Sequence, residues 1–252
     1  MELPLGRNVA GKSAKREYQR RSRAWRRRVF GRRATFGFWS VVSAVVLVAA
    51  TRDLGRPWTL LAGVFIGCAL ASSILLPEAL MPAWITRWRD GSWGEENTAR
   101  ELRRLERIGW TVRHDVGTSA GLWNRDHVVA GPAVYVIDSK NLADSRVTVE
   151  GETLRVTAIE DPHKSYVLDR FAVRHHAREF ERQARSSLGF GVAIYPVVAV
   201  WGAFEVREAW LGDLAVVHGR HLAEWLVSRP TDLVHDDKRQ LVARWVESLP
   251  GA

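Results

Sequence analysis

Residues 124–141, NRDHVVAGPAVYVIDSKN, decide how the rest of this chain of 252 residues is organised. The stretch holds two apolar segments rich in Val, Ile and Tyr, which are residue types that favour strands. Gly131-Pro132 separates the two segments, and this dipeptide is a strong turn signal. Consecutive apolar positions are typical of central strands that are covered on both faces. We therefore predict a hairpin at the centre of a sheet.

Charged residues occupy only the ends of this predicted hairpin. Side chains alternate between faces along a strand, so Asp138 and Lys140 share one face, about 7 Å apart. If the hairpin folds about Pro132, Asp126 lies opposite Asp138, and two carboxylates and an ammonium group converge. Burying such charges is unfavourable without a partner or a chemical role. Two simpler interpretations remain open: Asp138 and Lys140 form a structural ion pair, and Asp126 caps a loop.

Together with an upstream Gly-Glu pair, these residues resemble the motifs of the nuclease-related domain (NERD) family, a branch of the PD-(D/E)XK nuclease superfamily. In that family Gly-Glu opens a helix, Asn-x-Asp-His starts a strand, and acid-x-Lys-Asn ends the next strand. The corresponding residues here are Gly94-Glu95, Asn124-Arg125-Asp126-His127 and Asp138-Ser139-Lys140-Asn141. The resemblance extends over about residues 90–249. It departs from the family pattern twice: Asp138 replaces the usual Glu, and the Gly131-Pro132 turn is about one residue short.

The resemblance implies a restriction-endonuclease-like fold and a metal-dependent site for phosphodiester hydrolysis. It implies that Asp126, Asp138 and the backbone carbonyl of Ser139 hold Mg²⁺ or Mn²⁺. Such an ion acts as a Lewis acid and lowers the pKa of its bound water. Lys140 would stabilise the charge of the transition state, and Glu95 would complete the acidic cluster. A glutamate at a helix N-terminus is also favourable for electrostatic reasons alone, so a purely structural Glu95 remains open.

Other common catalytic motifs are absent from the sequence. The eight His residues form no zinc-ligand pattern, and no Gly-rich phosphate loop, dinucleotide fingerprint or Gly-x-Ser-x-Gly sequence occurs. The one Cys, Cys68, lies in an apolar run, which excludes intrachain disulfides and a thiolate metal cluster.

The basic charge is concentrated at the N-terminus. The net charge is +9, but residues 1–33 hold twelve Lys and Arg against two Glu. Residues 78–252 hold 23 Lys and Arg against 25 Asp and Glu, a balance of −2. We interpret residues 1–33 as a disordered basic cytoplasmic tail, with a nucleic-acid-binding arm as the alternative.

Two apolar runs follow this tail. Residues 34–51 and 57–77 carry no charge over 18 and 21 residues, and a helix of 18 residues spans about 27 Å, near the thickness of a bilayer core. The short link between them predicts a transmembrane helical hairpin, followed by a juxtamembrane connector at residues 78–90. The excess of basic residues before the first run places both chain ends in the cytoplasm, with the protein in the cell membrane. A signal peptide or a buried helix pair are the alternatives.

The remaining pattern predicts an α/β fold with a mixed central sheet flanked by helices. Helices are expected at 95–108, 161–187, 222–227 and 236–249, and strands at 110–116, 146–150, 153–158, 192–201 and 214–217. The long helix carries a basic residue every four positions, and this stripe either contacts phosphates or faces solvent. Its members are Arg170, Arg174, Arg178 and Arg182.

The sequence therefore favours a membrane-anchored nuclease that faces the cytoplasm, uses Mg²⁺ or Mn²⁺, and acts on nucleic acid, in the first place DNA. The alternative is a membrane-anchored module that keeps the nuclease fold, has no activity, and binds nucleic acid or protein.

Overall fold

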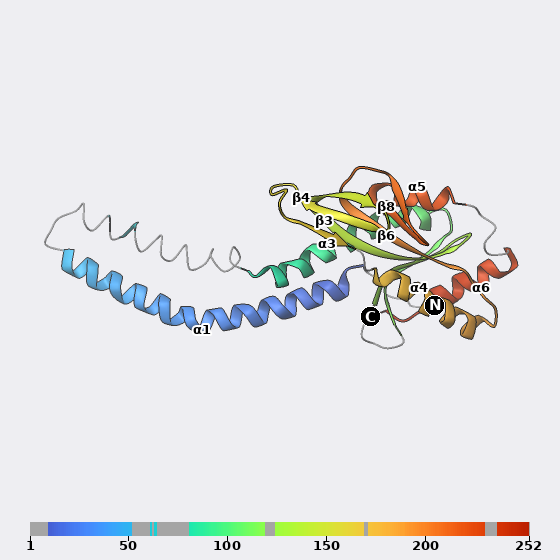
Figure 1. The fold of residues 1–252 in the computed structure, drawn as a ribbon. Helices are drawn as coiled ribbons and strands as arrows, with labels where there is room; N and C mark the ends of the chain where they lie inside the picture. Colours follow the sequence, from blue (N-terminus) through green and yellow to red (C-terminus); the bar gives the residue numbers. More distant parts are fainter. Residues whose placement is uncertain are drawn as a thin grey trace. The chain divides into compact units, whose positions relative to one another are not determined.

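A computed structural model gives the structure of the protein (Figure 1), and it describes residues 10–51, 61, 63–64, 81–118, 124–168, 171–229 and 236–251. The chain divides into two compact units. One unit comprises Met1–Lys15 and Arg89–Ala252, and the other comprises Arg16–Trp88.

The first unit is built on a mixed sheet, which confirms the predicted α/β fold with a mixed central sheet flanked by helices. Within the described residues the sheet has eight strands in the order β1-β2-β3-β6-β8-β7, with β4 pairing with β3, and β5 with β4. The β3–β6 and β6–β8 pairs are parallel and the other pairs are antiparallel. The strands are β1 (Thr111–Gly117), β2 (Asn124–Ala130), β3 (Val134–Glu150), β4 (Thr153–Ala158), β5 (Ser165–Leu168), β6 (Ile194–Phe204), β7 (Glu208–Leu211) and β8 (Leu214–His218).

The predicted central hairpin is formed by β2 and β3. Its register pairs Ala130 with Val134 and His127 with Ile137, and the Gly131 N–H donates to the Ala133 carbonyl at 2.9 Å across the turn. One step further along this register brings Asp126 opposite Asp138, as the sequence predicts. β3 then continues without interruption to Glu150, where two separate strands were expected.

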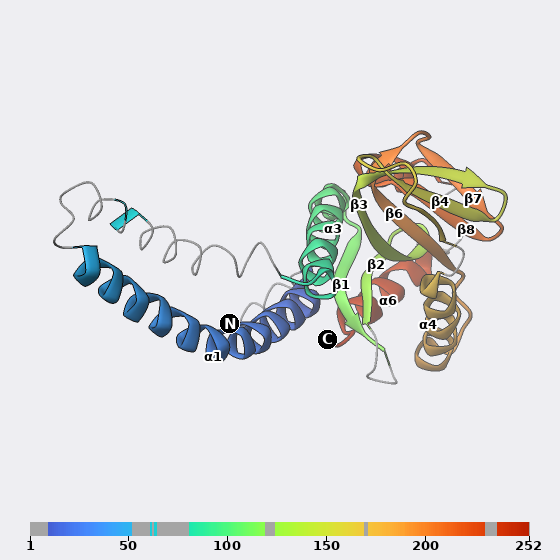
Figure 2. The ribbon, with the colours of Figure 1, turned by 60° about the vertical axis from the view of Figure 1, so that its left-hand side comes forward.

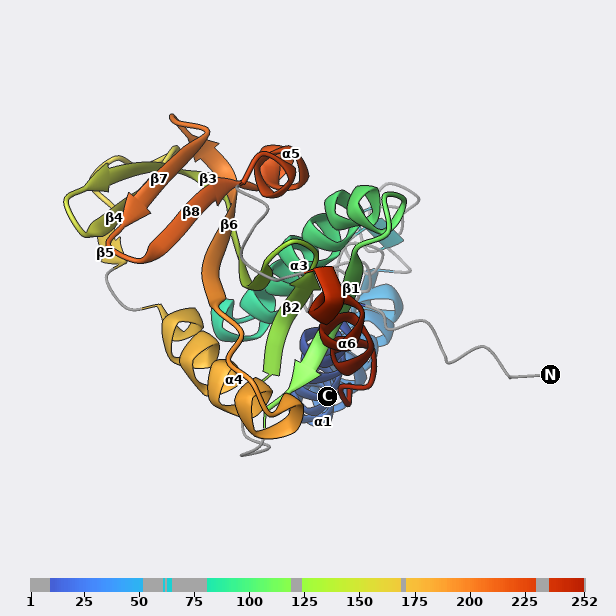
Figure 3. The ribbon, with the colours of Figure 1, turned by 90° about the vertical axis from the view of Figure 1, so that its right-hand side faces the viewer.

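Helices cover both faces of the sheet (Figures 2 and 3). Alternate residues of β3 enter two different cores. Val136 packs in a core with Phe180 of α4 (Ala172–Leu188) and with α6 (Asp236–Glu247). Ile137 packs in the other core with Leu102 of α3 (Ala83–Glu106) and with α5 (Leu222–Val227), which follows the short helix η2 (Gly219–His221). The central strands are therefore buried on both sides, as their continuous apolar pattern predicts.

The predicted helix at 161–187 is wrong in its first third. A turn closes with the Lys164 N–H donating to the Asp161 carbonyl at 2.9 Å, and residues 165–168 then pair with β4 as β5. Tyr166 and Val167 favour a strand, and an available neighbouring strand overrides the weaker helical pattern. α4 begins only at Ala172, and β7 was not predicted at all.

α3 begins earlier than expected. The prediction placed its start near Glu95, but the helix starts at Ala83, where the Ile85 N–H donates to the Pro82 carbonyl at 2.8 Å. Proline suits the beginning of a helix because its missing N–H needs no partner there. Residues 83–90 of the predicted connector are thus helical.

The second unit contains most of α1 (Lys12–Thr51). The expectation of a disordered tail is wrong for residues 12–33, which are helical and include nine Arg residues, a good helix former. The Arg21 guanidinium lies 5.7 Å from the ring centre of Trp84 and 5.0 Å from that of Trp88.

Of the two predicted membrane spans, residues 34–51 are helical within α1, whereas nearly all of 57–77 falls outside the described residues. Among the residues that the structure describes, no helix is both long and apolar enough to cross a membrane.

Candidate active site

The predicted site residues come together where β2 begins, beside the first half of β3. Asp126 Oδ2 accepts a hydrogen bond from the Ser139 backbone N–H at 2.8 Å. Lys140 Nζ lies 2.8 Å from Asp138 Oδ2 and 3.2 Å from Oδ1. The Asp138 and Lys140 side chains remain 20% and 37% exposed, so a substrate can reach them.

Strand geometry also places the Ser139 carbonyl. The N–H and C=O of one residue in a strand point to the same edge, because paired residues exchange both bonds with one partner. Since the Ser139 N–H points to Asp126, the Ser139 carbonyl lies on that same edge. Asp126 and the Ser139 carbonyl therefore offer oxygen atoms on one side of β3.

α3 brings Glu95 to the cluster, and Gly94 explains how it comes so close. A Cβ atom added at Gly94 would lie 3.2 Å from Cβ of Asn141, so only glycine fits comfortably at this crossing. Asn141 Nδ2 donates to the Asp90 carbonyl at 2.9 Å, and this bond connects β3 to α3 beside the site. Glu95 is 8% exposed, and its Oε2 atom is buried without a hydrogen-bond partner among the described residues.

The carboxylates of this cluster disfavour one another's charge. Burial, followed by the charges of Asp115 and Asp138, raises the pKa of Glu95 to about 7. Burial, followed by the charges of Asp138 and Glu95, raises the pKa of Asp126 well above its ordinary value. Burial alone would lower the pKa of Lys140, but the charge of Asp138 and its hydrogen bond outweigh it and raise the pKa. The cluster therefore holds protons near neutral pH and favours an added cation.

A segment near the N-terminus, which the sequence pattern does not place here, donates hydrogen bonds to two carboxylates of the cluster. The backbone N–H of Gly11 donates to Glu95, and the Ser13 N–H donates to Asp115 Oδ2 at 2.8 Å. Asn124 Nδ2 donates to Ser13 Oγ at 3.0 Å and also to Asp115 Oδ1. Asp115 has a φ of 52°, the left-handed region, where Asp and Asn are among the few side chains tolerated. The signal that could have identified it was an acid in β1 between His114 and Val116, within a strand that the sequence predicts.

A buried chain of hydrogen bonds supports the strands that carry the acidic cluster. His114 Nδ1 lies 2.7 Å from His127 Nδ1, and His127 Nε2 lies 3.1 Å from Ser139 Oγ. Thr98 Oγ1 lies 2.8 Å from Ser139 Oγ and accepts from Trp201 Nε1, also at 2.8 Å. Burial lowers the pKa of His114 to about 4 and that of His127 well below its ordinary value, so both rings are neutral. This chain connects β1, β2, β3, β6 and α3 at the level of the acidic cluster.

Arg125, the variable position of the Asn-x-Asp-His sequence, is an anchor that the sequence analysis did not identify. Its side chain is fully buried, 3.3 Å from a carboxylate oxygen of Glu179 and 4.7 Å from the ring centre of Phe180. It also donates to the Gly117 carbonyl at 3.0 Å. Arg125 thereby fixes α4 against β2, immediately beside Asp126.

The basic stripe of α4 is not uniform. Arg170 lies outside the described residues. Arg174 is 2.9 Å from Asp213 and also donates to the Leu211 carbonyl, so the fold itself supplies its anionic partner. Arg178 is 75% exposed at 3.8 Å from Asp213, and Arg182 is also exposed.

The site residues suit a hard divalent cation. No group of three or more His, Cys, Asp or Glu side chains within the described residues is close enough to hold a metal ion. Mg²⁺ needs only one or two carboxylates, because it keeps several waters. Asp126, Asp138 and the Ser139 carbonyl provide such a set of oxygen ligands. The Oε2 atom of Glu95, which has no hydrogen-bond partner among the described residues, is repelled by the negative charge of the same cluster.

A mixed sheet flanked by helices, with two aspartates and a lysine on adjoining strands, defines an α/β domain with a candidate active site. Residues 90–201 match the family model of the nuclease-related domain, NERD. This match suggests a nuclease-related function and is compatible with nucleic-acid binding. It contains Glu95, Asp126, Asp138 and Lys140, and it ends well before residue 249, where the resemblance was expected to end. No curated protein and no solved structure matches the chain significantly.

Proposed function

We propose that the protein is a divalent-metal-dependent nuclease that hydrolyses phosphodiester bonds of nucleic acid, with DNA as the first substrate to test. The observation that carries the proposal is the convergence of Asp126 of β2 with Asp138 and Lys140 of β3, with Glu95 from α3 beside them. The match of residues 90–201 to the nuclease-related domain supports it.

Each side chain has a distinct role in this proposal. Asp126, Asp138 and the Ser139 carbonyl would hold Mg²⁺ or Mn²⁺, which would supply a Lewis acid and lower the pKa of bound water. The Lys140 ammonium, kept charged by Asp138, stabilises the negative charge that develops on the phosphate. Glu95, whose pKa burial and the neighbouring carboxylates raise to about 7, would complete the acidic cluster around the ion.

A cleavage assay tests this proposal directly. Purified full-length protein is incubated with labelled single- and double-stranded DNA and RNA in Mg²⁺, in Mn²⁺ and in EDTA. Cleavage should require the metal and should be lost in Asp126→Asn. The matched control is Asp237→Asn, an exposed acid at the start of α6, which should keep the wild-type rate. Cleavage that survives both EDTA and Asp126→Asn would exclude the site.

The ion pair of Lys140 and Asp138, at 2.8 Å, favours a second candidate function. Lys140 can act as a structural partner, and the domain then serves as a binding module without activity. In that case Mg²⁺ should not raise the melting temperature of the full-length protein. Either single substitution, Lys140→Ala or Asp138→Asn, should destabilise the domain because it leaves one partly buried charge alone. In the nuclease, Asp138→Asn should instead leave stability unchanged or raised, because it relieves the repulsion among the acids.

We further propose that residues 34–51 and 57–77 anchor the protein in the cell membrane with both chain ends in the cytoplasm. The support is the charge-free length of the two runs and the twelve Lys and Arg residues before them. Reporter fusions after residue 30 and after Ala252 test the topology. An extracytoplasmic signal from either fusion would contradict the hairpin.

Arg178 and Arg182 are the stripe residues best placed to contact phosphates, because Arg174 already has an anionic partner. Changing both to Glu should weaken nucleic-acid binding and reduce the slope of affinity against salt concentration. A slope that stays at the wild-type value would mean that the stripe faces only solvent.

A further inference from the structure

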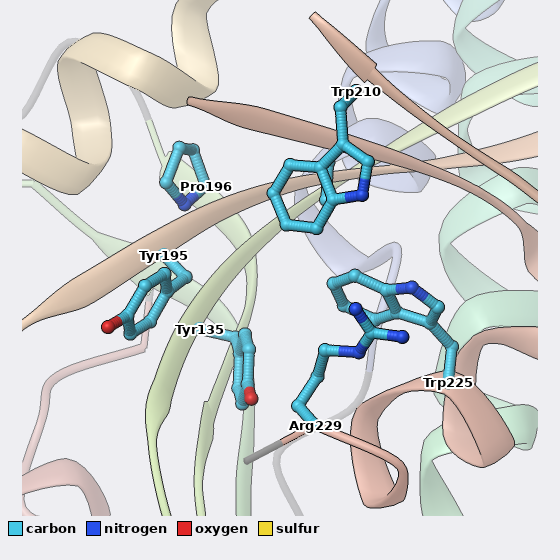
Figure 4. A pocket seen from close by; sticks show the side chains of 7 residues that line it. Tyr135, Tyr195, Pro196, Trp210, Trp225 and Arg229 are labelled. Atoms are coloured by element: carbon cyan, nitrogen blue, oxygen red, sulfur yellow. The ribbon is translucent and has the colours of Figure 1, made fainter. Parts of the chain in front are cut away.

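A cavity lies outside the candidate active site. Its volume is about 260 Å³, and it opens between the sheet and α5 (Figure 4). Strands β3, β6, β7 and β8, together with α5 and the turn that follows it, supply its walls. The lining residues are Tyr135, Tyr195, Pro196, Trp210, Ala215, Trp225 and Arg229.

This cavity is separate from the acidic cluster. Tyr135 and Asp138 are three residues apart in β3, which is about 10 Å along the strand, and their side chains point to opposite faces. Trp210, Trp225 and Arg229 also lie beyond Trp201, where the match to the nuclease-related domain ends. Neither the proposed chemistry nor the family match accounts for the cavity.

Aromatic rings form the wall but do not fill the space. The ring centres of Tyr135 and Tyr195 are 5.8 Å apart, and those of Tyr135 and Trp225 are 6.3 Å apart at an angle of 66°. Trp210 lies 6.1 Å from Trp225 at an angle of 47°, and its side chain is half exposed. Figure 4 shows these rings around a common space. Such walls suit a flat ring that stacks on one of them.

Arg229 gives the cavity a polar specificity. Its guanidinium lies 4.7 Å from the ring centre of Trp225 and 3.4 Å from a carboxylate oxygen of Glu208. Its Nε atom is buried and has no hydrogen-bond partner among the described residues. Burial raises the pKa of Tyr135 to about 12, so this phenol also stays a protonated donor. The cavity is therefore suited to a flat ligand with hydrogen-bond acceptor atoms, and it disfavours a cationic ligand.

We propose that this cavity binds a nucleobase. A base is flat, it has carbonyl and ring-nitrogen acceptors in its plane, and it stacks on aromatic side chains whatever its sequence. An aliphatic side chain has no acceptor for Arg229, and a quaternary ammonium group would meet the like charge of the guanidinium. The volume lies just below the roughly 300–1,000 Å³ of pockets for drug-sized ligands, as expected for one base. The base can belong to a free nucleotide or to an unpaired position of a strand.

The test measures binding of the full-length protein in EDTA, so that metal-dependent cleavage plays no part. Three probes are compared by calorimetry: a short single-stranded DNA, the same length with abasic sites, and adenosine monophosphate. The base-bearing strand should bind roughly 5- to 150-fold more tightly than the abasic strand. Trp210→Ala should remove this difference, and Arg229→Lys, which retains the charge but lacks Nε, should reduce it.

The matched control is Trp84→Ala, because Trp84 is 46% exposed, Trp210 is 49% exposed, and Trp84 does not line the cavity. It should bind all three probes as the wild type does. Binding of adenosine monophosphate that depends on Trp210 identifies a free nucleotide as the ligand, and binding of the strand alone identifies an unpaired base. Equal affinity for base-bearing and abasic strands, together with no binding of adenosine monophosphate, would overturn the proposal. Asp126→Asn should leave the base preference intact, so loss of nuclease activity and loss of base binding are distinguishable.

Discussion

Replacing Glu95 by Gln should make the protein more stable at alkaline pH and should have little effect at acidic pH. In the folded protein the pKa of Glu95 is raised from 4.5 to about 7, by burial and by the charges of Asp115 and Asp138. The folded state therefore binds a proton more tightly than the unfolded chain does. The stabilisation from this proton is complete below pH 4.5 and is lost as the pH rises through 7.

The size of the effect follows from the shift. One pKa unit corresponds to about 1.4 kcal/mol, so the shift of Glu95 weakens the folded state by about 3 kcal/mol at pH 8 relative to pH 4. A glutamine is neutral at every pH and avoids this loss. For a unit of this size the gain should appear as a melting temperature raised by roughly 6–12 °C at pH 8.

Thermal melts of full-length wild type and Glu95→Gln between pH 4.5 and 9 measure this difference. Glu96→Gln is the matched control, because Glu96 is adjacent in α3, has a side chain that is 43% exposed and makes only a 3.7 Å pair with Lys15. Its melting temperature should follow that of the wild type, as for most surface substitutions. The reasoning is refuted if the gap between Glu95→Gln and wild type is constant with pH, or if it grows toward acidic pH.

Three further substitutions test the parts that surround the cluster. Lys140→Ala should remove most of the cleavage rate while keeping a Mg²⁺-dependent rise in melting temperature, whereas the exposed Lys164→Ala should change neither. Arg125→Met should destabilise the unit by about 3–5 kcal/mol in urea unfolding, because it breaks the ion pair of the fully buried Arg125 with Glu179, and adding Glu179→Leu should recover part of this. Thr98→Val leaves two buried donors without their acceptor and should lower stability by about 1–3 kcal/mol; a loss below the experimental error would contradict the hydrogen-bond chain.

The fold was predictable where burial and periodicity agree. The hairpin of β2 and β3, its covered faces and the position of Asp126 opposite Asp138 follow from apolar runs, a turn signal and the two-residue period of a strand. The failures lie where tertiary contacts outweigh local pattern. Residues 165–168 join the sheet because β4 offers a free edge, although their surroundings favoured a helix.

Some parts of the site were not predicted because they come from distant points of the chain. Gly11 and Ser13 reach Glu95 and Asp115 across about a hundred positions, and no short motif encodes such a contact. Arg125 was overlooked because charge was expected to avoid the core, whereas here it is buried with Glu179 as a partner.

The register of β3 connects the two proposed sites. Odd-numbered positions place Tyr135 at the aromatic cavity and the Ser139 hydroxyl in the buried hydrogen-bond chain. Even-numbered positions place Asp138 and Lys140 in the ion pair at the acidic cluster. A shift of one residue would exchange the two faces, so it would bury the acids against α3 and expose the aromatic ring to α4. The parallel partner β6 holds this register along both sites, from Tyr195 opposite Tyr135 to Val200 opposite Lys140. One pairing between two central strands therefore fixes both the charge cluster and the cavity, and a change in that pairing should impair both together.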